Sequence, residues 1–239
     1  MSVRLHDGLA ARIGRVDHPV AVLDVDLTLV ENAPRTRALL IDFCKLHCPD
    51  LIARAESMEL VFSIARNAES LGLPDPLRAL IPAFWWRTFF SPDYLVHDVL
   101  LEGAREAVDA LREAGVTVVY LTARPSSLVA ATAVSFARLG LPLGVSGTAL
   151  VTKDDPAMSD HAFKAGAFGW IRRVGHPVLV ADNEPAHVNA MSETFPEALA
   201  VHVATRHSEP APPLSDGIVV ARRLLDALKG DSQAELGPS

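Results

Sequence analysis

The sequence has little of what marks secreted, membrane-spanning or nucleic-acid-binding proteins. Only two of its 239 residues are cysteines, too few for a disulfide framework. No apolar run reaches the ~18 residues that a membrane-spanning helix needs. Residues 1–18 carry a charge every few positions and lack an apolar stretch, so no secretory signal is visible. These absences predict a cytoplasmic protein with no membrane partner.

Positive charge is also scarce. The chain has 22 Lys and Arg against 29 Asp and Glu, which gives a net charge of −7. A protein that grips nucleic acid through its phosphates needs the opposite balance, so we expect no nucleic-acid partner. A small phosphorylated substrate is compatible with this charge, because a local cationic pocket is enough to hold it. The length suits one large domain or a core with a smaller insert.

The two cysteines, Cys44 and Cys48, stand four residues apart on a predicted helix, with His47 beside them. A soft-metal site on that helix face is one interpretation, although it requires more ligands than these. Reduced thiols on a cytosolic helix are the other interpretation, and we favour it.

The stretch 20–30 organises the rest of the chain. Its apolar run at 21–23 predicts a strand buried on both faces of a parallel sheet. Asp24 and Asp26 come next, and we expect the strand to end at Asp24 because desolvation of an unpaired carboxylate is costly. Ligands of open α/β sheets bind beyond the carboxyl ends of the strands, where both acids are therefore expected.

Two acids this close repel each other unless a cation or a shared proton intervenes. A hard divalent cation such as Mg²⁺ takes oxygen ligands and lets both acids face one site. Asp24 is then placed to attack phosphorus and form an aspartyl-phosphate, while Asp26 protonates the leaving oxygen and later deprotonates water. The alternative is a surface turn with two solvated acids.

Apolar periodicity predicts alternating strands and helices along most of the chain. Strands are expected at 19–24, 116–121, 147–152, 177–181 and 199–204, and helices at 1–18, 102–111, 127–139, 162–174, 187–193 and 217–228. Helices between apolar strands indicate an α/β protein with a Rossmann-like parallel sheet covered by helices on both faces.

A helical stretch of roughly 60 residues separates the first strand from the next α/β unit, which is too long for a crossover loop. It predicts a helical cap domain inserted at 33–96. The core is then formed by 1–32 and 97–229, and a disordered tail is expected at 230–239.

Two patterns stand out inside the predicted insert. Apolar residues at 60, 61, 64 and 65 predict one helical stripe, and 77–90 is expected to be a further helix rich in aromatic residues. The aromatic cluster packs the core of the insert or closes over a substrate. We expect at least one of Trp85, Trp86 and Arg87 to face the site.

Polar residues follow three of the predicted strands, with Asp24 and Asp26 after the first, Thr122 after the second and Asp182 after a later one. Lys164 opens the helix before that last strand. The carboxyl ends of parallel strands meet at one edge, so these residues are expected to converge there. Such a set suits phosphoryl transfer: Thr122 binds phosphoryl oxygens, Lys164 holds phosphate and nucleophile together, and Asp182 completes the oxygen shell of a metal.

Some assignments stay open at this point. Lys153, in a polar turn, is the rival of Lys164 for the phosphate-binding lysine, and its alternative role is a solvated turn residue. Arg124 contacts a substrate phosphate or forms a salt bridge on its loop. His97 and His187 show no partner in the sequence, and we interpret both as structural or exposed.

The segments DVDLT, YLTAR, FK at a helix start and VADNE resemble, in this order, the four motifs of the haloacid dehalogenase superfamily. The helical insert resembles that family's C1-type cap. The resemblance implies that Asp24 is the nucleophile and Asp26 the general acid and base. It also implies Mg²⁺ bound by Asp24, the backbone carbonyl of Asp26, and Asp182. Because the family's dehalogenases lack the second acid, Asp26 points to phosphate-ester hydrolysis.

The fourth motif departs from the family pattern, in which a second acid stands next to the first or four to five residues later. Here Asn183 and Glu184 are the two candidates to assist the metal through water. We therefore expect a Mg²⁺-dependent phosphatase that hydrolyses a small phosphorylated molecule through an aspartyl-phosphate. The alternatives are phosphoryl transfer to an acceptor other than water and a non-catalytic protein that binds a phosphorylated ligand. The oligomeric state is not predicted.

Overall fold

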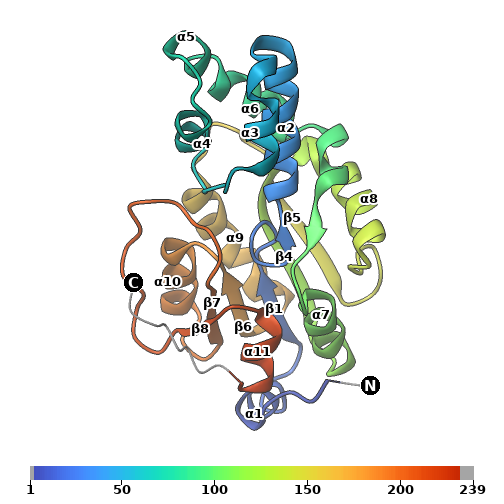
Figure 1. Cartoon of the computed structure of the whole chain (residues 1–239). Coiled ribbons are helices and arrows are strands. Elements are labelled where there is room, and N and C mark those ends of the chain that lie inside the picture. Colours follow the sequence, from blue (N-terminus) through green and yellow to red (C-terminus); the bar gives the residue numbers. More distant parts are fainter. Residues whose placement is uncertain (1–2, 232–239) are drawn as a thin grey trace.

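The computed structural model describes residues 3–231 and is built on one six-stranded parallel sheet (Figure 1). The strand order is β5-β4-β1-β6-β7-β8, and every neighbouring pair is parallel. The strands are β1 (Pro19–Leu23), β4 (Thr117–Pro125), β5 (Thr148–Lys153), β6 (His176–Asp182), β7 (Leu199–Val203) and β8 (Val219–Ala221). The first strand of the chain thus lies inside the sheet, between β4 and β6.

Helices cover both faces of the sheet because the strand side chains alternate between two apolar layers. Ala21 and Leu23 of β1 belong to one layer, Val20 and Val22 to the other, and all four are fully buried. The first layer is closed by α1 (Asp7–Ile13), α7 (Ala104–Glu113), α8 (Val129–Leu139, preceded by the short η3 at Ser126–Leu128) and α11 (Leu224–Lys229). The second is closed by α9 (Asp160–Val174) and α10 (Pro185–Thr194). The predicted Rossmann-like α/β fold is confirmed.

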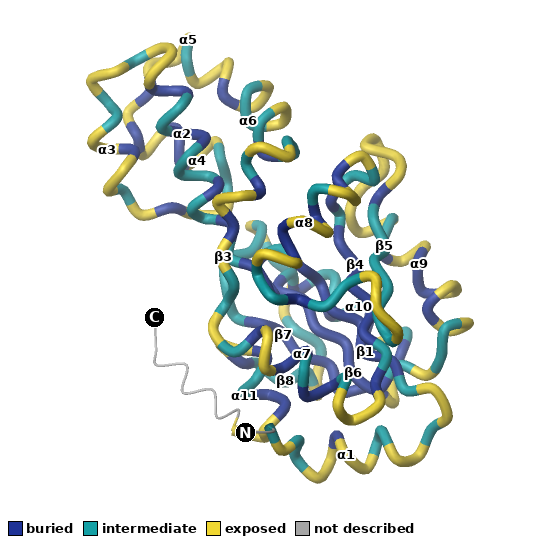
Figure 2. Tube along the Cα trace, turned by 90° about the vertical axis from the view of Figure 1, so that its right-hand side faces the viewer, coloured by how far each residue is buried: buried dark blue, intermediate teal, exposed yellow. Residues whose placement is uncertain are grey.

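The segment 33–96, which we call the helical insert, forms a separate helical body above the sheet (Figures 1 and 2). It contains α2 (Ala33–His47), η1 (Pro49–Leu51), α3 (Ile52–Ser57), α4 (Ile64–Leu71), α5 (Asp75–Arg78), α6 (Ile81–Phe89) and most of η2 (Pro92–His97). Its own apolar core includes Leu39, Phe43, Leu71 and Ile81. The chain enters through β2 (Val30–Glu31) and returns through β3 (Val99–Leu100), and these two strands pair antiparallel.

Three predicted elements are wrong in detail. The helix expected at 217–228 is a strand followed by a helix, because the apolar, β-branched run at 218–221 pairs with β7 at the sheet edge. The helix expected at 77–90 is interrupted between α5 and α6. The stripe expected at 60–65 is broken: residues 58–63 form a loop, and α4 starts only at Ile64, where Ser63 Oγ accepts a hydrogen bond from Arg66 N.

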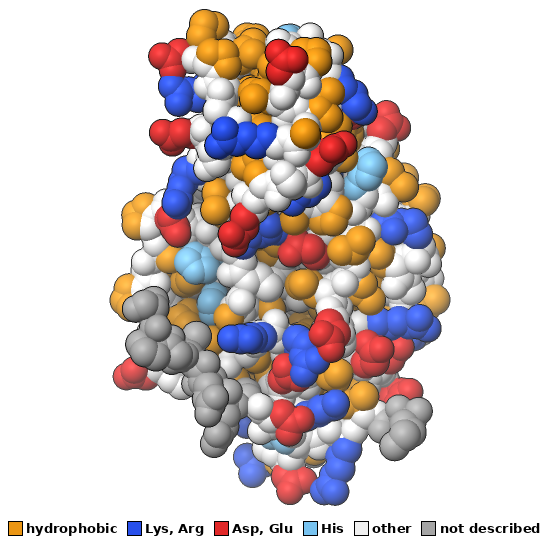
Figure 3. Space-filling model, viewed as in Figure 1, with side chains coloured by type: hydrophobic (Ala, Val, Ile, Leu, Met, Phe, Trp, Pro, Cys, Tyr) orange, Lys and Arg blue, Asp and Glu red, His pale blue; other side chains and the backbone are white. Residues whose placement is uncertain are grey.

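The surface carries mixed charge, and on the face drawn in Figure 3 Lys and Arg side chains alternate with Asp and Glu. Within residues 3–231, none of the helices combines the length and apolar character needed to cross a membrane. The predicted tail from Gly230 falls largely on residues 232–239, which lie outside the described part of the chain.

Candidate active site

A buried lysine joins two carboxylates at the carboxyl ends of β1 and β6. Asp24 follows β1, Asp182 ends β6, and Lys164 comes from the second turn of α9. The Nζ of Lys164 lies 2.7 Å from Asp24 Oδ1 and 2.6 Å from Asp182 Oδ2. All three side chains are almost completely buried. The sheet topology thus brings together three of the residues that the sequence singled out.

The charges of this group do not balance, because two carboxylates share one ammonium. Burial, opposed by Lys164 and reinforced by the charge of Asp182, raises the pKa of Asp24 to about 7. Burial acts in the same direction on Asp182, but Lys164 outweighs it and holds the pKa of that carboxyl at about 2. When both carboxylates are ionised, the site holds an excess of buried negative charge that a bound cation would neutralise.

A magnesium ion fits the donor set of this site. The carboxylates of Asp24 and Asp182 are hard oxygen donors, and the backbone carbonyl of Asp26 has no hydrogen-bond partner among the described residues. No three His, Cys, Asp or Glu side chains within 3–231 are grouped closely enough to hold a metal. A metal bound here would therefore need a backbone oxygen or water beside the two carboxylates.

The two candidates for an additional metal contact are engaged elsewhere. Asn183 donates through Nδ2 to the backbone oxygen of Arg206 at 2.7 Å. The carboxylate of Glu184 accepts hydrogen bonds from Ser208, at 3.0 Å from its N and 2.6 Å from its Oγ. Both side chains line the cavity described below.

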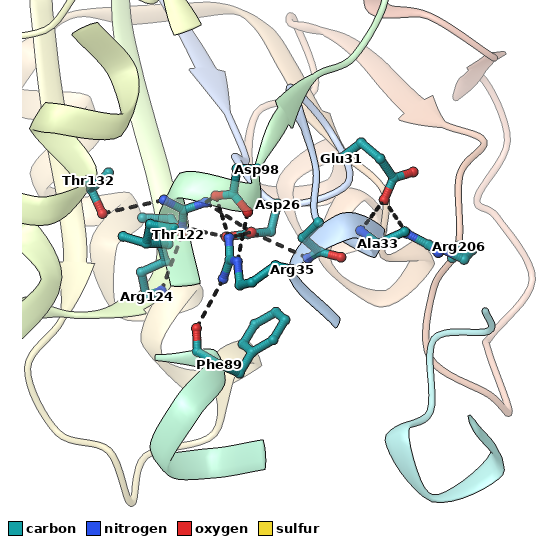
Figure 4. Close-up of polar contacts among 12 residues, drawn as sticks. Asp26, Glu31, Ala33, Arg35, Phe89, Asp98, Thr122, Arg124, Thr132 and Arg206 are labelled. Carbon is teal, nitrogen blue, oxygen red and sulfur yellow. Dashed lines mark hydrogen bonds and ion pairs between the residues drawn. The ribbon is translucent and has the colours of Figure 1, made fainter. Parts of the chain in front are cut away.

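Asp26 lies beside this group but belongs to a second polar network (Figure 4). Arg124 donates from Nε to Asp26 Oδ2 at 2.6 Å and from Nη2 to Oδ1 at 3.0 Å, and Arg35 Nη2 donates to Oδ1 at 2.9 Å. Burial by itself would raise the pKa of Asp26, but the two guanidinium groups outweigh it and hold the pKa well below its usual range. Asp26 is thus an anion in this arrangement.

The second network includes Arg35 and Asp98, two residues that sequence reasoning missed. Asp98 accepts hydrogen bonds from Arg35 Nε at 2.7 Å and Nη2 at 2.6 Å, and from Arg124 Nη2 at 3.0 Å. Arg35 also packs its guanidinium over the ring of Phe89, 4.3 Å from the centroid. Two arginines and two aspartates give this network a balanced charge. Arg124 forms the salt bridge that was one of its two predicted roles, although its partners lie outside its own loop.

The turn that follows Asp26 is strained. Leu27 adopts a left-handed backbone with φ of 66°, which costs roughly 1–2 kcal/mol for a residue with a side chain. Three interactions hold it: its N–H donates to Val30 O at 2.6 Å, its carbonyl accepts from Thr205 Oγ1 at 2.5 Å, and its side chain is buried. Strain of this kind concentrates at functional sites.

Thr122, on β4, lies at the same edge of the sheet. Its Oγ1 accepts a hydrogen bond from Arg124 N at 3.2 Å, and the side chain is 1% exposed. Lys153, by contrast, is not in the group: its Nζ lies 2.6 Å from Asp160 Oδ1, and the side chain is buried. The expectation of a solvated turn lysine is therefore wrong, although the structure brings only Lys164 to the acids.

The remaining candidates have clear positions. His187 is half-buried, with its Nδ1 3.7 Å from Asp182 Oδ2, and His97 is exposed. Cys44 and Cys48 are free, and burial raises the pKa of Cys44 to about 12. The absence of a third ligand within residues 3–231 favours reduced thiols over a soft-metal site.

A cavity of about 490 Å³ lies over both networks. Its floor includes Asp24, Asp26, Thr122, Arg124 and Lys164, all supplied by the body that contains the sheet. Its roof is supplied by the helical insert, through the loop at 58–63 and the helix α6. Of the three insert residues expected to face the site, Trp85 lines the cavity.

Comparison with known proteins identifies the fold. No protein-family model and no curated protein matches the sequence. Among solved structures, a predicted phosphoglycolate phosphatase from Haemophilus somnus 129pt is similar with a TM-score of 0.58 and 13% identity, over 90% of this chain and 98% of that one. A haloacid dehalogenase-like hydrolase from Streptococcus pneumoniae gives 0.54 and 12%, over 88% and 96%. Protein tyrosine kinase A from Mycobacterium tuberculosis gives 0.56 and 14%, over 86% and 94%.

The fold of this chain is therefore that of the haloacid dehalogenase-like hydrolases. The resemblance inferred from the four motifs is confirmed at this level. The fold does not name the reaction, since proteins described as a phosphatase and as a kinase share it.

Proposed function

We propose that the protein is a Mg²⁺-dependent phosphatase that hydrolyses a small phosphorylated molecule through an aspartyl-phosphate on Asp24. The observation that carries this proposal is the Lys164 ammonium, buried between Asp24 and Asp182 on the floor of the cavity. An ammonium in this position neutralises a phosphoryl group and keeps the nucleophile anionic. Mg²⁺ held by Asp24, Asp182 and the carbonyl of Asp26 would supply further charge neutralisation for the phosphoryl oxygens.

Asp24 Oδ2, the oxygen that Lys164 does not contact, attacks phosphorus while the bond from phosphorus to the ester oxygen breaks. Thr122 and neighbouring backbone N–H groups hold the phosphoryl oxygens. The ester oxygen takes a proton from Asp26 and leaves as an alcohol. Asp26, now anionic, removes a proton from water, which attacks the aspartyl-phosphate and releases inorganic phosphate and Asp24.

Proton donation by Asp26 requires a change from the arrangement in the structure. Its carboxylate accepts hydrogen bonds from Arg35 and Arg124, and these keep it anionic. Its side chain is 23% exposed, on the side of the cavity. In the proposed reaction Asp26 turns away from the arginines, takes up a proton from water in the cavity and donates it to the ester oxygen. Arg124 keeps its pairing with Asp98 and can also contact the substrate phosphate.

The helical insert acts as the cap of this site. It supplies the roof of the cavity, and the chain enters and leaves it through β2 and β3, which pair antiparallel. A body tethered in this way excludes water from the reacting groups when it closes.

Release of inorganic phosphate from a panel of phosphate monoesters, with Mg²⁺ or with EDTA, tests the proposal. We expect turnover that EDTA abolishes, and a phosphoenzyme that can be trapped by acid quench and is missing from Asp24→Asn. Asp26→Asn should lower kcat by about 10²–10⁴-fold, because both proton transfers are lost. Full activity in EDTA, or in Asp24→Asn, would refute the proposal. Transfer of the phosphoryl group to an added alcohol at the expense of water would favour the phosphotransferase alternative.

A further inference from the structure

Within residues 3–231, the roof of the cavity contains no charged side chain. The helical insert contributes Val61, Phe62 and Ile64 from the loop and the start of α4, and Trp85, Phe89 and Phe90 from the end of α6. Its other contributions to the lining are the hydroxyls of Thr36 and Ser63. A substrate group that points from the phosphate towards the roof therefore meets a wall of apolar surface.

The loop part of this wall is exposed yet held in place. Val61 is 36% and Phe62 48% exposed, so two consecutive large apolar side chains remain in contact with solvent beside the acids. The buried side chain of Asn67 holds the backbone of Val61 through two hydrogen bonds of 2.8 Å. The N–H of Val61 donates to Asn67 Oδ1, and Asn67 Nδ2 donates to the carbonyl of Val61. Arg37 donates to the carbonyl of Met58 at 2.9 Å. The exposed apolar surface is thus built into the structure.

The helix part of the wall is preformed by ring packing. Trp85 stacks on Phe89 with centroids 4.7 Å apart and an interplanar angle of 24°, and Phe90 meets Trp85 edge-on at 5.5 Å. These rings pack against the core of the insert and also line the cavity. Because they hold each other, a ligand meets a rigid aromatic face with little ordering of side chains.

A negatively charged leaving group finds no free cation in the described lining. Lys164 is paired with Asp24 and Asp182, and Arg124 with Asp26 and Asp98. The third cation, Arg206, is paired with Glu31. Carboxylates outnumber cationic side chains around the cavity, so a carboxylate on the leaving group would be repelled or would have to break an existing ion pair.

We infer that the group esterified to phosphate is an uncharged, apolar alcohol or phenol whose aromatic ring lies against Phe62, Trp85 and Phe90. This inference rests on the proposed phosphatase function. It sets the protein apart from hydrolases whose leaving group carries a carboxylate, since glycolate would need a cation in the roof. It equally disfavours sugars, whose hydroxyls would lose water against this wall without finding hydrogen-bond partners.

The substrate test compares alcohols of similar leaving ability that differ in the group facing the roof. We expect kcat/KM for 2-phenylethyl phosphate to exceed that for ethyl phosphate by about 10–100-fold, and the values for 2-phosphoglycolate and glucose 6-phosphate to fall below ethyl phosphate. Equal values for the phenylethyl and ethyl esters, or a preference for 2-phosphoglycolate, would overturn the inference. O-Phosphoethanolamine as the best substrate would do the same, because it would show that the lining carboxylates select a cation.

Substitutions in the insert test whether the preference for the phenylethyl ester arises from the apolar wall. Phe62→Ala should reduce the ratio of phenylethyl to ethyl ester by about 5–10-fold, and Phe62→Lys should raise kcat/KM for 2-phosphoglycolate. Leu46→Ala is the control: Leu46 is an apolar residue of the same insert, on α2, but it is 69% exposed and does not line the cavity, so both rates should stay unchanged. An unchanged ratio in Phe62→Ala would contradict the contact with this residue.

A binding measurement separates this inference from the proposed reaction. 2-Phenylethylphosphonate and ethylphosphonate have no ester bond to phosphorus, and calorimetric titration of either with Mg²⁺ present needs no turnover. Tighter binding of the phenylethyl compound by about 10-fold or more, lost in Phe62→Ala, supports the apolar wall even if no ester is hydrolysed. Equal affinity for the two phosphonates would overturn it, whatever the enzyme assay shows.

Discussion

The guanidinium of Arg35 and the carboxylate of Asp98 form a fully buried pair with two short hydrogen bonds, 63 residues apart in the chain. Arg35 lies in the first turn of α2, where the helical insert begins, and Asp98 directly precedes β3, where the chain returns. The pair therefore closes the base of the insert. Because Arg35 also contacts Asp26, the position of the insert and the position of that acid are linked through one side chain.

Asp98→Asn tests how much this pair contributes to the free energy of unfolding. The substitution keeps the shape but leaves the charge of two buried guanidinium groups with less compensation, so we expect the free energy of unfolding to fall by about 3–5 kcal/mol. Asp109→Asn is the control, since Asp109 forms an exposed pair with Arg105 at 3.7 Å and should cost less than about 1 kcal/mol. Urea unfolding of both variants gives the comparison. A loss in Asp98→Asn no larger than in Asp109→Asn would show that the buried pair does not hold the insert.

Lys164 and Lys153 are the two candidates for the phosphate-binding lysine. The structure places only Lys164 beside the acids, and the kinetics of substituted enzymes test this assignment. Lys164→Met removes the cation between Asp24 and Asp182, and we expect kcat/KM for a phosphate ester to fall by about 10²–10³-fold, as for loss of one electrostatic donor. Lys153→Met removes an ion pair with Asp160 and a hydrogen bond to Met158 O, neither of which involves the acids of the site, and the variant should stay near the wild-type rate. A Lys153→Met enzyme with the larger defect would move the phosphate-binding role to that residue.

His202 makes the stability of the protein depend on pH. The residue is 6% exposed on β7, its Nε2 lies 2.9 Å from Asn183 O, and its Nδ1 is buried without a partner. Burial lowers the pKa of His202 below its usual 6.5, while the carbonyl of Asn183 acts in the opposite direction. The unfolded chain therefore binds this proton more readily, and the contribution of His202 to stability is lost as the pH falls below about 6.5.

Urea unfolding of the wild type and of His202→Gln at about pH 7.5 and about pH 5.5 isolates this contribution, because every other ionisable group is common to the two proteins. We expect the wild type to lose more stability than the variant over that interval. His207, whose ring lies 6.0 Å away, and the nearby charges of Asp182 and Glu184 are present in both. A larger loss in the variant would mean that protonated His202 stabilises the fold.

The residues on the floor of the site could be predicted from the sequence, for a physical reason. An apolar run that ends in acids marks the carboxyl end of a buried strand, and parallel strands bring such ends to one edge of the sheet. Asp24, Thr122 and Asp182 could be placed in this way. Lys164 was favoured over Lys153 because it opens the helix before Asp182, and the helix does carry it to the acids.

The roof and the second network could not be placed by the same reasoning. Arg35 is one of two arginines in α2, and nothing in its spacing marks it as the one that meets Asp98; the packing of the insert decides this. Val61 matches the predicted helical stripe by type, but Asn67 holds its backbone in a loop through hydrogen bonds that hydrophobic periodicity cannot predict. The run at 218–221 is short enough to fit a helix or a strand, and pairing with β7 selects the strand.

Two glycines of the α9 region should respond to substitution in opposite directions. Gly175 ends the helix that carries Lys164, and a Cβ there would collide with the backbone oxygen of His18 and lie 2.9 Å from Val20 Cγ2. Gly169 lies within α9, is exposed, and has open space at its Cβ position. Gly175→Ala should therefore lower the free energy of unfolding by about 1–3 kcal/mol through overpacking, whereas Gly169→Ala should raise it by about 0.5–1 kcal/mol by stiffening the unfolded chain and favouring the helix.

Thermal and urea unfolding of the two variants beside the wild type provide the measurement. The close approach at Gly175 also sets how α9 runs back into β6, since His176 N donates to His18 O at 2.9 Å directly beside it. The collision of a Cβ with that same oxygen cannot be relieved by rotating a side chain, so the backbone has to shift. If Gly175→Ala were as stable as Gly169→Ala, the entry to β6 would be able to move without cost.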